Sequence, residues 1–225
     1  MLAIVEASDN LSLQVHPDDA AAKELEGAPF GKNESWYFLR PPKSGKIFDG
    51  TTVSSIAEVE RLIAERKMSQ LADTLEIETG DYVFVEAGTL HAITADSLVF
   101  EIEENSEYTY RVFDFDRVDD HGMKRPLHID RALRALKPKL KSSVRRYEGA
   151  IAERLYTTQL LDSLASYRNS SRTLECLTLL DDSIDEQLDG IRLSFGMTIV
   201  LEPEECVHLA VGKTMLSRVN VEAVR

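Results

Sequence analysis

Leu11-Ser-Leu-Gln14-Val-His16-Pro-Asp-Asp19 alternates polar and apolar residues in the way a half-buried β-strand does. Successive side chains of a strand point to opposite faces, so one face is predicted to carry Ser12, Gln14 and His16 and the other Leu11, Leu13 and Val15. An amide oxygen and an imidazole two residues apart on one face can bind a common ligand. The pair also occurs by chance in many strands, so its meaning depends on the other segments.

The composition is that of a soluble globular chain, long enough for one large domain or two small ones. The 225 residues are 43% hydrophobic and 29% charged, with a net charge of −13. This acidity disfavours nucleic acids and anionic membranes as partners. The chain has no apolar run that would span a bilayer, and residues 1–7 lack the basic start of a signal peptide. Cys176 and Cys206 are too few for a disulfide framework, which predicts ordinary thiols and a cytoplasmic location.

Short strands are predicted along most of the chain, with a few helices between them. Early strands are expected at residues 1–5, 32–39, 82–85 and 97–104, and helices at 20–25, 53–73 and 129–136. Ser55 and Glu58 form a capping-box pattern at the start of the second helix. Taken alone, residues 32–39 are expected to form an edge strand, and the basic stretch 137–146 a solvated loop.

The chain changes character from about Arg154, where short strands are expected at residues 174–180, 191–195, 198–201, 207–211 and 214–219. Residues 196–203 echo residues 80–87, which predicts a second, smaller β unit with a structural role. We therefore expect a metal-binding domain at residues 1–150, with a helical insert at about 53–73, and a second domain at residues 151–225.

Three further segments place reactive side chains on or beside strands. The turn at Gly88 is predicted to deliver His91 to the start of a strand, although a hydrogen-bonded core histidine is the alternative. Glu101 and Glu103 share a strand face with Val99, and an inward carboxylate is costly unless it is paired or used. Arg111 offers a planar fork for oxyanions, with an ion pair to a nearby aspartate as the alternative.

Together, Gln14, His16, Glu34 and His91 make a mixed nitrogen and oxygen donor set. Two imidazoles, one carboxylate and one amide oxygen suit zinc, and iron or manganese with less preference. The ligand charge of −1 against +2 on the ion leaves a net +1. Such a site favours an anionic oxygen that develops on a substrate.

Four segments also carry a family resemblance. They are Gln14-Val-His16-Pro-Asp-Asp, Gly31-Lys32-Asn-Glu34-Ser-Trp-Tyr, Gly80-Asp-Tyr-Val-Phe-Val-Glu-Ala-Gly88-Thr-Leu-His91-Ala-Ile and Tyr108-Thr-Tyr-Arg111-Val-Phe-Asp-Phe-Asp-Arg117. In order and spacing they resemble the type I mannose-6-phosphate isomerases of the cupin superfamily, in their short bacterial form. The resemblance implies a mainly β fold with a few helices, in which a cupin-type β-barrel (jelly roll) precedes a smaller, degenerate cupin-like β unit. It also implies an enzyme that interconverts mannose 6-phosphate and fructose 6-phosphate with one Zn²⁺ per chain.

By the same resemblance, the metal ligands are His16, Glu34, His91 and Gln14, and the catalytic residues are Arg111, Lys32, Glu101 and Glu107. Our hypothesis is that a proton moves from C2 to C1 of the sugar through a cis-enediol(ate). Glu101 would carry the proton, Arg111 would stabilise the enediolate, and Lys32 would orient substrate oxygens or assist ring opening. The metal would polarise the sugar oxygens.

Two departures from the family keep an alternative open. The family has a segment before the Gln-x-His strand, so the chain is expected to be N-terminally truncated relative to it. Glu86 stands where the family's turn has proline. The alternative is therefore a catalytically impaired cupin that binds metal or sugar phosphate without turnover. Lys32 and Arg111 argue against a metal-dependent dioxygenase, and a homodimer through the first strand is left open.

Overall fold

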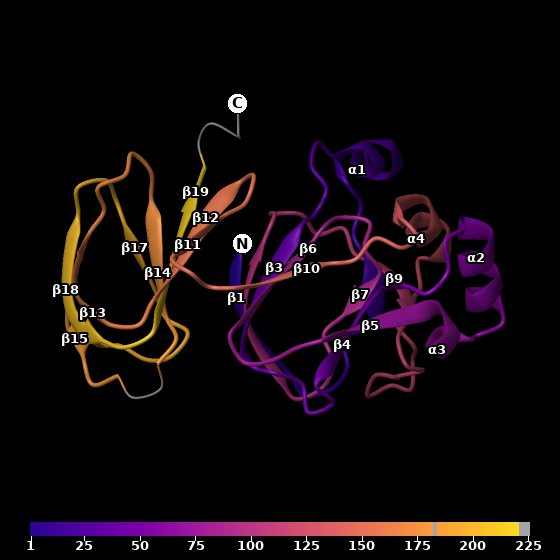
Figure 1. Ribbon diagram of the computed structural model, residues 1–225, viewed down its shortest axis with the longest axis horizontal. Coiled ribbons are helices and arrows are strands. Elements are labelled where there is room, and N and C mark those ends of the chain that lie inside the picture. The colour runs from indigo at the N-terminus through magenta and orange to yellow at the C-terminus, as the bar shows by residue number, and fades with distance from the viewer. Residues whose placement is uncertain (182–183, 221–225) are drawn as a thin grey trace. The chain divides into compact units, whose positions relative to one another are not determined.

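A computed structural model describes residues 1–181 and 184–220 of the chain, which divides into two units, Met1–Arg146 and Tyr147–Arg225 (Figure 1). Antiparallel strand pairs make up most of both units. The mainly β fold with a few helices is therefore confirmed. The roles expected for the two domains, metal binding in the first and structural support in the second, stay predictions.

Two five-stranded sheets form the body of the first unit. One has the order β1 (Leu2–Ala7), β8 (Ser97–Glu103), β3 (Glu34–Arg40), β6 (Asp81–Val85) and β10 (Ser143–Arg146). The other has the order β5 (Ala72–Glu76), β4 (Lys46–Thr51), β7 (His91–Ala92), β2 (Leu13–Val15) and β9 (Tyr110–Phe113). Trp36 and Phe38 of the first sheet share one buried cluster with Ile47 of the second, so the sheets enclose a common core.

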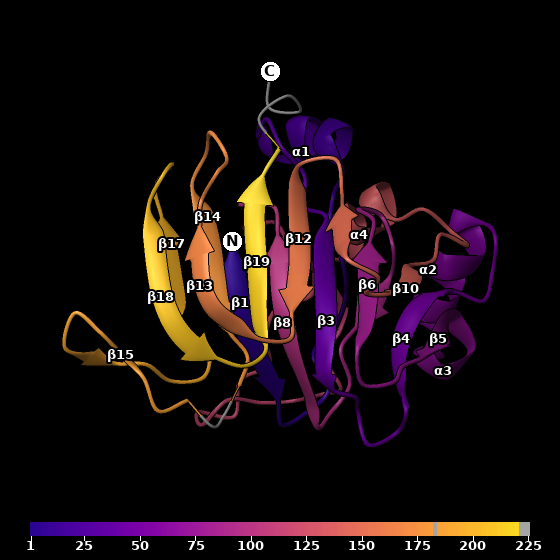
Figure 2. The same cartoon turned by 60° about the vertical axis from the view of Figure 1, so that its left-hand side comes forward.

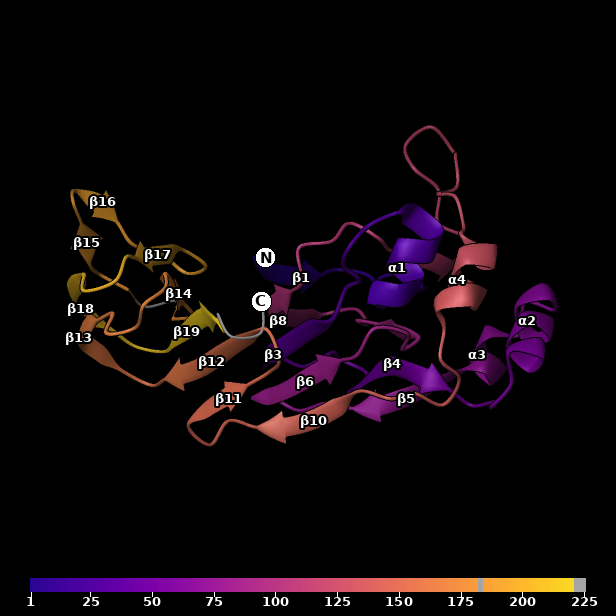
Figure 3. The same ribbon diagram turned by 90° about the horizontal axis from the view of Figure 1, so that it is seen from above.

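Helices pack against the outer face of the second sheet (Figures 1 and 3). They are α1 (Asp19–Glu26), α2 (Ile56–Ala64), α3 (Met68–Leu71) and α4 (Ile129–Ala135). Leu13 and Val15 of β2 lie in one cluster with Val59 and Leu62 of α2. The apolar face predicted for β2 thus points at the helices, and its polar face points between the sheets. Leu11 is an exception, because it precedes the strand and packs into the core between the sheets instead.

The helical insert predicted at residues 53–73 is two helices and a strand. Arg66 has a left-handed φ of 56° and lies between α2 and α3. This break allows Leu62 of α2 and Leu71 of α3 to enter the same core. The sequence carries no glycine or proline at this point, so no local signal marks the break.

Two expectations about individual strands are wrong. Residues 32–39 do not form an edge strand, since β3 lies between β8 and β6 in the middle of its sheet. The basic stretch 137–146 is not only a loop, since its end forms β10, where Arg145 pairs with Tyr82 of β6. Both errors have one cause. Strand order depends on partners that are distant in the sequence.

The second unit has a five-stranded sheet of its own among its described residues (Figure 2). Its order is β11 (Ala150–Ala152), β12 (Tyr156–Leu161), β19 (Thr214–Val219), β14 (Glu175–Leu179) and β17 (Thr198–Leu201). Two further pairs are β13 (Leu164–Arg168) with β18 (Cys206–Val211), and β15 (Gln187–Leu188) with β16 (Ile191–Arg192). The strands predicted at 198–201 and 214–219 are confirmed, whereas that predicted at 191–195 is shorter. Within the described ranges, no helix is long and apolar enough to cross a membrane, and both cysteines are free thiols.

Candidate metal centre

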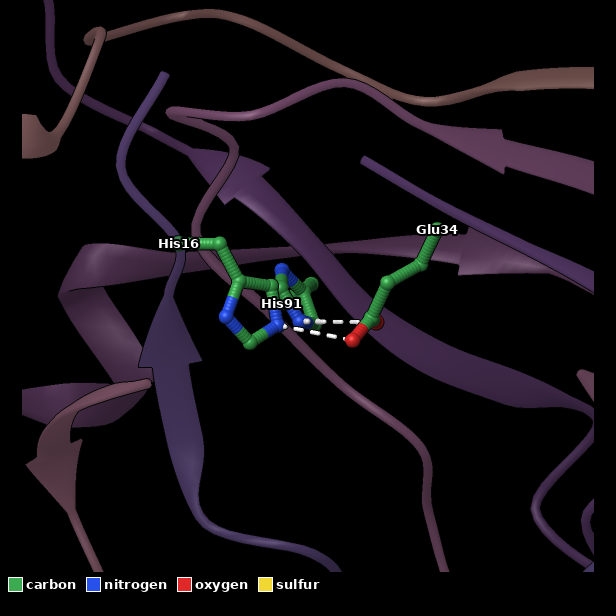
Figure 4. A group of neighbouring side chains, drawn as sticks. All are labelled: His16, Glu34 and His91. Atoms are coloured by element: carbon green, nitrogen blue, oxygen red, sulfur yellow. Dashed lines mark ion pairs between the residues drawn. The ribbon is translucent and has the colours of Figure 1, made fainter. Parts of the chain in front are cut away.

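Three of the predicted metal ligands meet in the interior of the first unit (Figure 4). Glu34 begins β3 in one sheet, while His91 begins β7 and His16 directly follows β2 in the other. All three side chains are at most 3% exposed. The segments that carry them are far apart in the sequence, and the facing of the two sheets brings them together.

The distances between these side chains are short enough for a shared ion. His16 Nε2 lies 2.9 Å from Glu34 Oε1, and His91 Nε2 lies 3.6 Å from Glu34 Oε2 (Figure 4). One donor atom from each residue falls within 4.8 Å of the others. The ring centroids of the two histidines are 4.9 Å apart.

In each histidine, the hydrogen bond made by Nδ1 determines whether Nε2, the nitrogen that faces Glu34, carries a hydrogen. His16 Nδ1 lies 3.0 Å from the carbonyl oxygen of Tyr108, and His91 Nδ1 lies 2.9 Å from that of Thr89. A carbonyl only accepts, so each Nδ1 carries a hydrogen, and in a neutral ring Nε2 then holds a lone pair. With no hydrogen on His16 Nε2, its 2.9 Å approach to Glu34 Oε1 is not a hydrogen bond, and among the described residues this buried nitrogen has no other partner. Two lone pairs and a carboxylate facing one another fit a bound divalent cation.

The pKa shifts of Glu34 and His91 suit this donor set. Burial, followed by the neighbouring His16, lowers the pKa of His91 to about 4, which leaves its ring neutral. Burial by itself would raise the pKa of Glu34, but His16, His91 and Lys32 hold it well below its usual value. Glu34 therefore supplies a carboxylate and His91 a neutral nitrogen.

Gln14, the fourth predicted ligand, lies beside the cluster. It is the cross-strand partner of His91 on one side and of Arg111 on the other. Its Nε2 is 3.5 Å from His91 Nε2, and its Oε1 accepts from Ser12 Oγ at 3.0 Å. A half-turn of the amide would present the oxygen to the cluster instead, so Gln14 can reach the centre as a ligand.

Lys32 and Glu101 extend the cluster along the inner face of the first sheet. Lys32 Nζ is 2.9 Å from Glu34 Oε1 and also contacts Glu103 Oε2. Burial lowers the pKa of Lys32, but the two carboxylates reverse this effect and raise it overall. Trp36 Nε1 donates to Glu101 Oε1 at 2.8 Å. Burial, reinforced by the charge of Glu34, raises the pKa of Glu101 to about 8.

Glu103 is a site residue to which the sequence assigned no role. Alternation along β8 places it on the inward face with Glu101, and this alternation is the sequence signal that points to Glu103 as a site residue. Its contact with Lys32 depends on the pairing of β3 with β8, which places Glu34 opposite Glu103.

Arg111 and Glu107 lie outside the cluster. Both line a cavity of about 630 Å³ that Gln14 also borders. Arg111 donates from Nη1 to the carbonyl oxygen of Pro126. Arg117 is directed elsewhere, because its guanidinium donates to the carbonyl oxygens of Asp114 and Asn10 and to the Asp114 carboxylate.

Known proteins resemble this chain in sequence and in fold. No protein-family model matches the chain. The mannose-6-phosphate isomerase of Streptococcus mutans is 41% identical over 133 residues, which are 59% of this chain and 42% of that protein. The mannose-6-phosphate isomerase ManA of Bacillus subtilis is 34% identical over 133 residues, again 59% of this chain and 42% of that protein. The predicted resemblance to mannose-6-phosphate isomerases is confirmed.

The chain spans less than half the length of these curated relatives. Solved structures extend the likeness of fold to nearly the whole chain. The mannose 6-phosphate isomerase of Bacillus subtilis superposes with a TM-score of 0.78 at 24% identity, covering 96% of this chain and 74% of that one. A variant of phosphomannose isomerase from Salmonella typhimurium gives a TM-score of 0.64 at 13% identity, covering 97% and 78%. The expected cupin-type barrel with a smaller β unit therefore stands.

Proposed function

We propose that the chain is a zinc-dependent isomerase that interconverts mannose 6-phosphate and fructose 6-phosphate. The observation that carries the proposal is the buried meeting of His16, Glu34 and His91 in a fold shared with mannose-6-phosphate isomerases. These three residues and Gln14 would hold one Zn²⁺ per chain. When bound, the ion would polarise the oxygens at C1 and C2 of the sugar.

Glu101 is the proposed proton carrier. Aldose–ketose isomerisation requires a base that removes the proton from C2 and returns it at C1 by way of a cis-enediolate. A carboxylate whose pKa burial has raised to about 8 is a stronger base than an ordinary one, and a pKa this close to neutral pH suits a group that must both accept and return a proton. The indole N–H of Trp36 orients it at 2.8 Å.

Arg111 and Lys32 complete the proposed mechanism. Arg111 lies across the β2–β9 pairing from Gln14, where its permanent charge would stabilise the negative oxygen of the enediolate. Lys32 holds Glu34 and Glu103 with its ammonium group and keeps a third N–H for a substrate oxygen. Glu107, on the cavity wall, is the remaining acidic residue proposed for the site.

The test combines metal analysis with a coupled assay for fructose 6-phosphate. We expect about one zinc per chain, loss of turnover in a chelator and recovery on adding Zn²⁺. Glu34→Gln removes the only charged ligand, so zinc affinity and turnover should both fall at least about 100-fold. Glu60→Gln, an exposed position on α2, is the control and should change neither.

Two results would contradict the proposal in different ways. Full turnover in a chelator would remove the metal from the mechanism. One zinc per chain without turnover would favour the alternative of a cupin that binds metal but does not isomerise. The same proposal includes a cytoplasmic location, a sugar phosphate as the partner and no binding of nucleic acid. Light scattering on the purified chain tests for the homodimer.

A further inference from the structure

The cavity beside the candidate metal centre has an unusually cationic wall for so acidic a chain. It measures about 630 Å³ and is bordered by Gln14, whose amide also approaches His91. Three arginines and a histidine line it, namely Arg111, Arg125, Arg131 and His128. Arg125, Arg131 and His128 have no part in the chemistry proposed above, and all lie in the first unit.

Arg125 is held in a defined orientation by Asp114, a carboxylate that is only 5% exposed. Its Nε donates to Asp114 Oδ2 at 2.8 Å, and its Nη2 contacts Oδ1. Arg117 Nη2 donates to the same Oδ1 at 2.5 Å. Two guanidinium groups thus share one carboxylate, and one positive charge in this group has no counterion there. Among the described residues the Nη1 group of Arg125 has no hydrogen-bond partner, so it is left for a ligand.

His128 and Arg111 are joined by a hydrogen bond that sets the imidazole tautomer. The backbone N–H of Arg111 donates to His128 Nδ1 at 3.1 Å. That nitrogen is therefore an acceptor, and the hydrogen of neutral His128 sits on Nε2, where it can be donated to a ligand. The guanidinium of Arg111 donates to a carbonyl oxygen, and among the described residues it forms no ion pair.

The carboxylates of the wall do not cancel this positive charge. When Asp114 and its second partner Arg117 are counted with the wall, three carboxylates (Glu26, Glu107 and Asp114) stand against four guanidinium groups. Glu26 already accepts from Tyr110 Oη at 2.8 Å and lies 3.4 Å from Arg131 Nη1. The wall keeps a net positive charge, although the whole chain carries −13. A local excess of this kind attracts an anion that the rest of the surface repels.

We propose that Arg125 and Arg131, with the Nε2–H of His128, bind the phosphate group of the substrate. This inference rests on the proposed function, because it assigns the phosphate end of the same sugar. Guanidinium groups match the geometry of phosphate oxygens, and a pair of them suits a dianion. Gln14 borders both the cavity and the metal cluster. In the proposed arrangement, the sugar carbons therefore lie between the phosphate group in the cavity and the metal. Arg111 faces the reacting end, and Arg125 and Arg131 face the phosphate.

Arg131→Gln is the decisive variant, because α4 offers a matched control. Arg131 is 52% exposed and pairs with Glu26, whereas Arg134 is 53% exposed and pairs with Glu24 outside the cavity. Losing one charge-assisted hydrogen bond should weaken binding of inorganic phosphate to the zinc-loaded protein about tenfold by calorimetry. The KM for mannose 6-phosphate should rise by a similar factor with little change in kcat. Arg134→Gln should change neither.

Arg125→Lys gives a second test that keeps the charge opposite Asp114. It removes the planar fork, so phosphate affinity should fall while thermal unfolding stays close to that of the unaltered chain. Unaltered phosphate affinity in both Arg131→Gln and Arg125→Lys would overturn the inference, whether or not the chain isomerises sugars. Weakened phosphate binding in both variants of a chain without turnover would support this site and reject the proposed function.

Discussion

Gly31 determines how closely two parts of the candidate metal centre approach. A Cβ atom at this position would lie 2.3 Å from the carbonyl oxygen of Pro17, closer than side chains and backbone ever come. The missing side chain lets the N–H of Lys32 donate to that same oxygen at 3.0 Å. The contact ties the segment after His16 to the segment before Glu34. A single glycine therefore sets the spacing of two proposed ligands.

Gly31→Ala should disturb both stability and the centre. The obstructing atoms belong to the backbone, which cannot turn aside as a long side chain can, so we expect a loss of about 1–3 kcal/mol in the free energy of unfolding. Zinc affinity should fall as well, and denaturant unfolding and metal titration measure the two effects. Pro29→Ala, an exposed change two residues away, should have neither effect. Unaltered zinc affinity in Gly31→Ala would contradict the role assigned to this contact.

At the scale of single elements, helix α2 shows what a local pattern can and cannot predict. Ser55 caps it as the capping-box pattern predicted, since its Oγ accepts from the N–H of Glu58 at 3.2 Å. The end of the helix at Ala64 was not predicted. A cap is a contact between near neighbours in the chain, whereas this end depends on the core that Leu71 must enter.

Ser55→Ala should remove one hydrogen bond to the first turn of α2 and cost about 1 kcal/mol of stability. Ser54→Ala is the matched control, because Ser54 is also exposed but lies outside the cap. Thermal unfolding of the two variants should separate them by a few degrees. Zinc affinity should be the same in both, as α2 supplies no ligand. Equal melting temperatures would show that the cap contributes nothing.

At the scale of the whole molecule, the proposed chemistry is confined to the first unit. Every proposed metal ligand and catalytic residue lies within Met1–Arg146. The second unit has its own buried cluster, with Leu177 and Leu179 fully buried in it. Each unit thus has the apolar core that independent stability requires.

Truncating a core residue in each unit should separate stability from metal binding. Leu177→Ala should lower the stability of the second unit by about 2–5 kcal/mol and leave zinc affinity unchanged. Phe38→Ala should cost about 3–5 kcal/mol in the first unit and reduce zinc affinity, because Phe38 lies on the same strand as Glu34. Scanning calorimetry with and without Zn²⁺ measures both. A loss of zinc affinity in Leu177→Ala would show that the second unit supports the centre.

Residue types and short-range patterns were sufficient to predict the candidate donor groups and the local elements that carry them. The donor types of Gln14, His16, Glu34 and His91, the inward face of β8 and the cap of α2 follow from residue type, strand alternation and near-neighbour contacts. Three features follow from the tertiary fold alone: β3 is a central strand, Lys32 is held by Glu103, and Asp114 orients Arg125 toward a cavity. These features depend on which distant segments pair, and the pairing that forms is the one that buries a shared apolar core. No single segment contains that information.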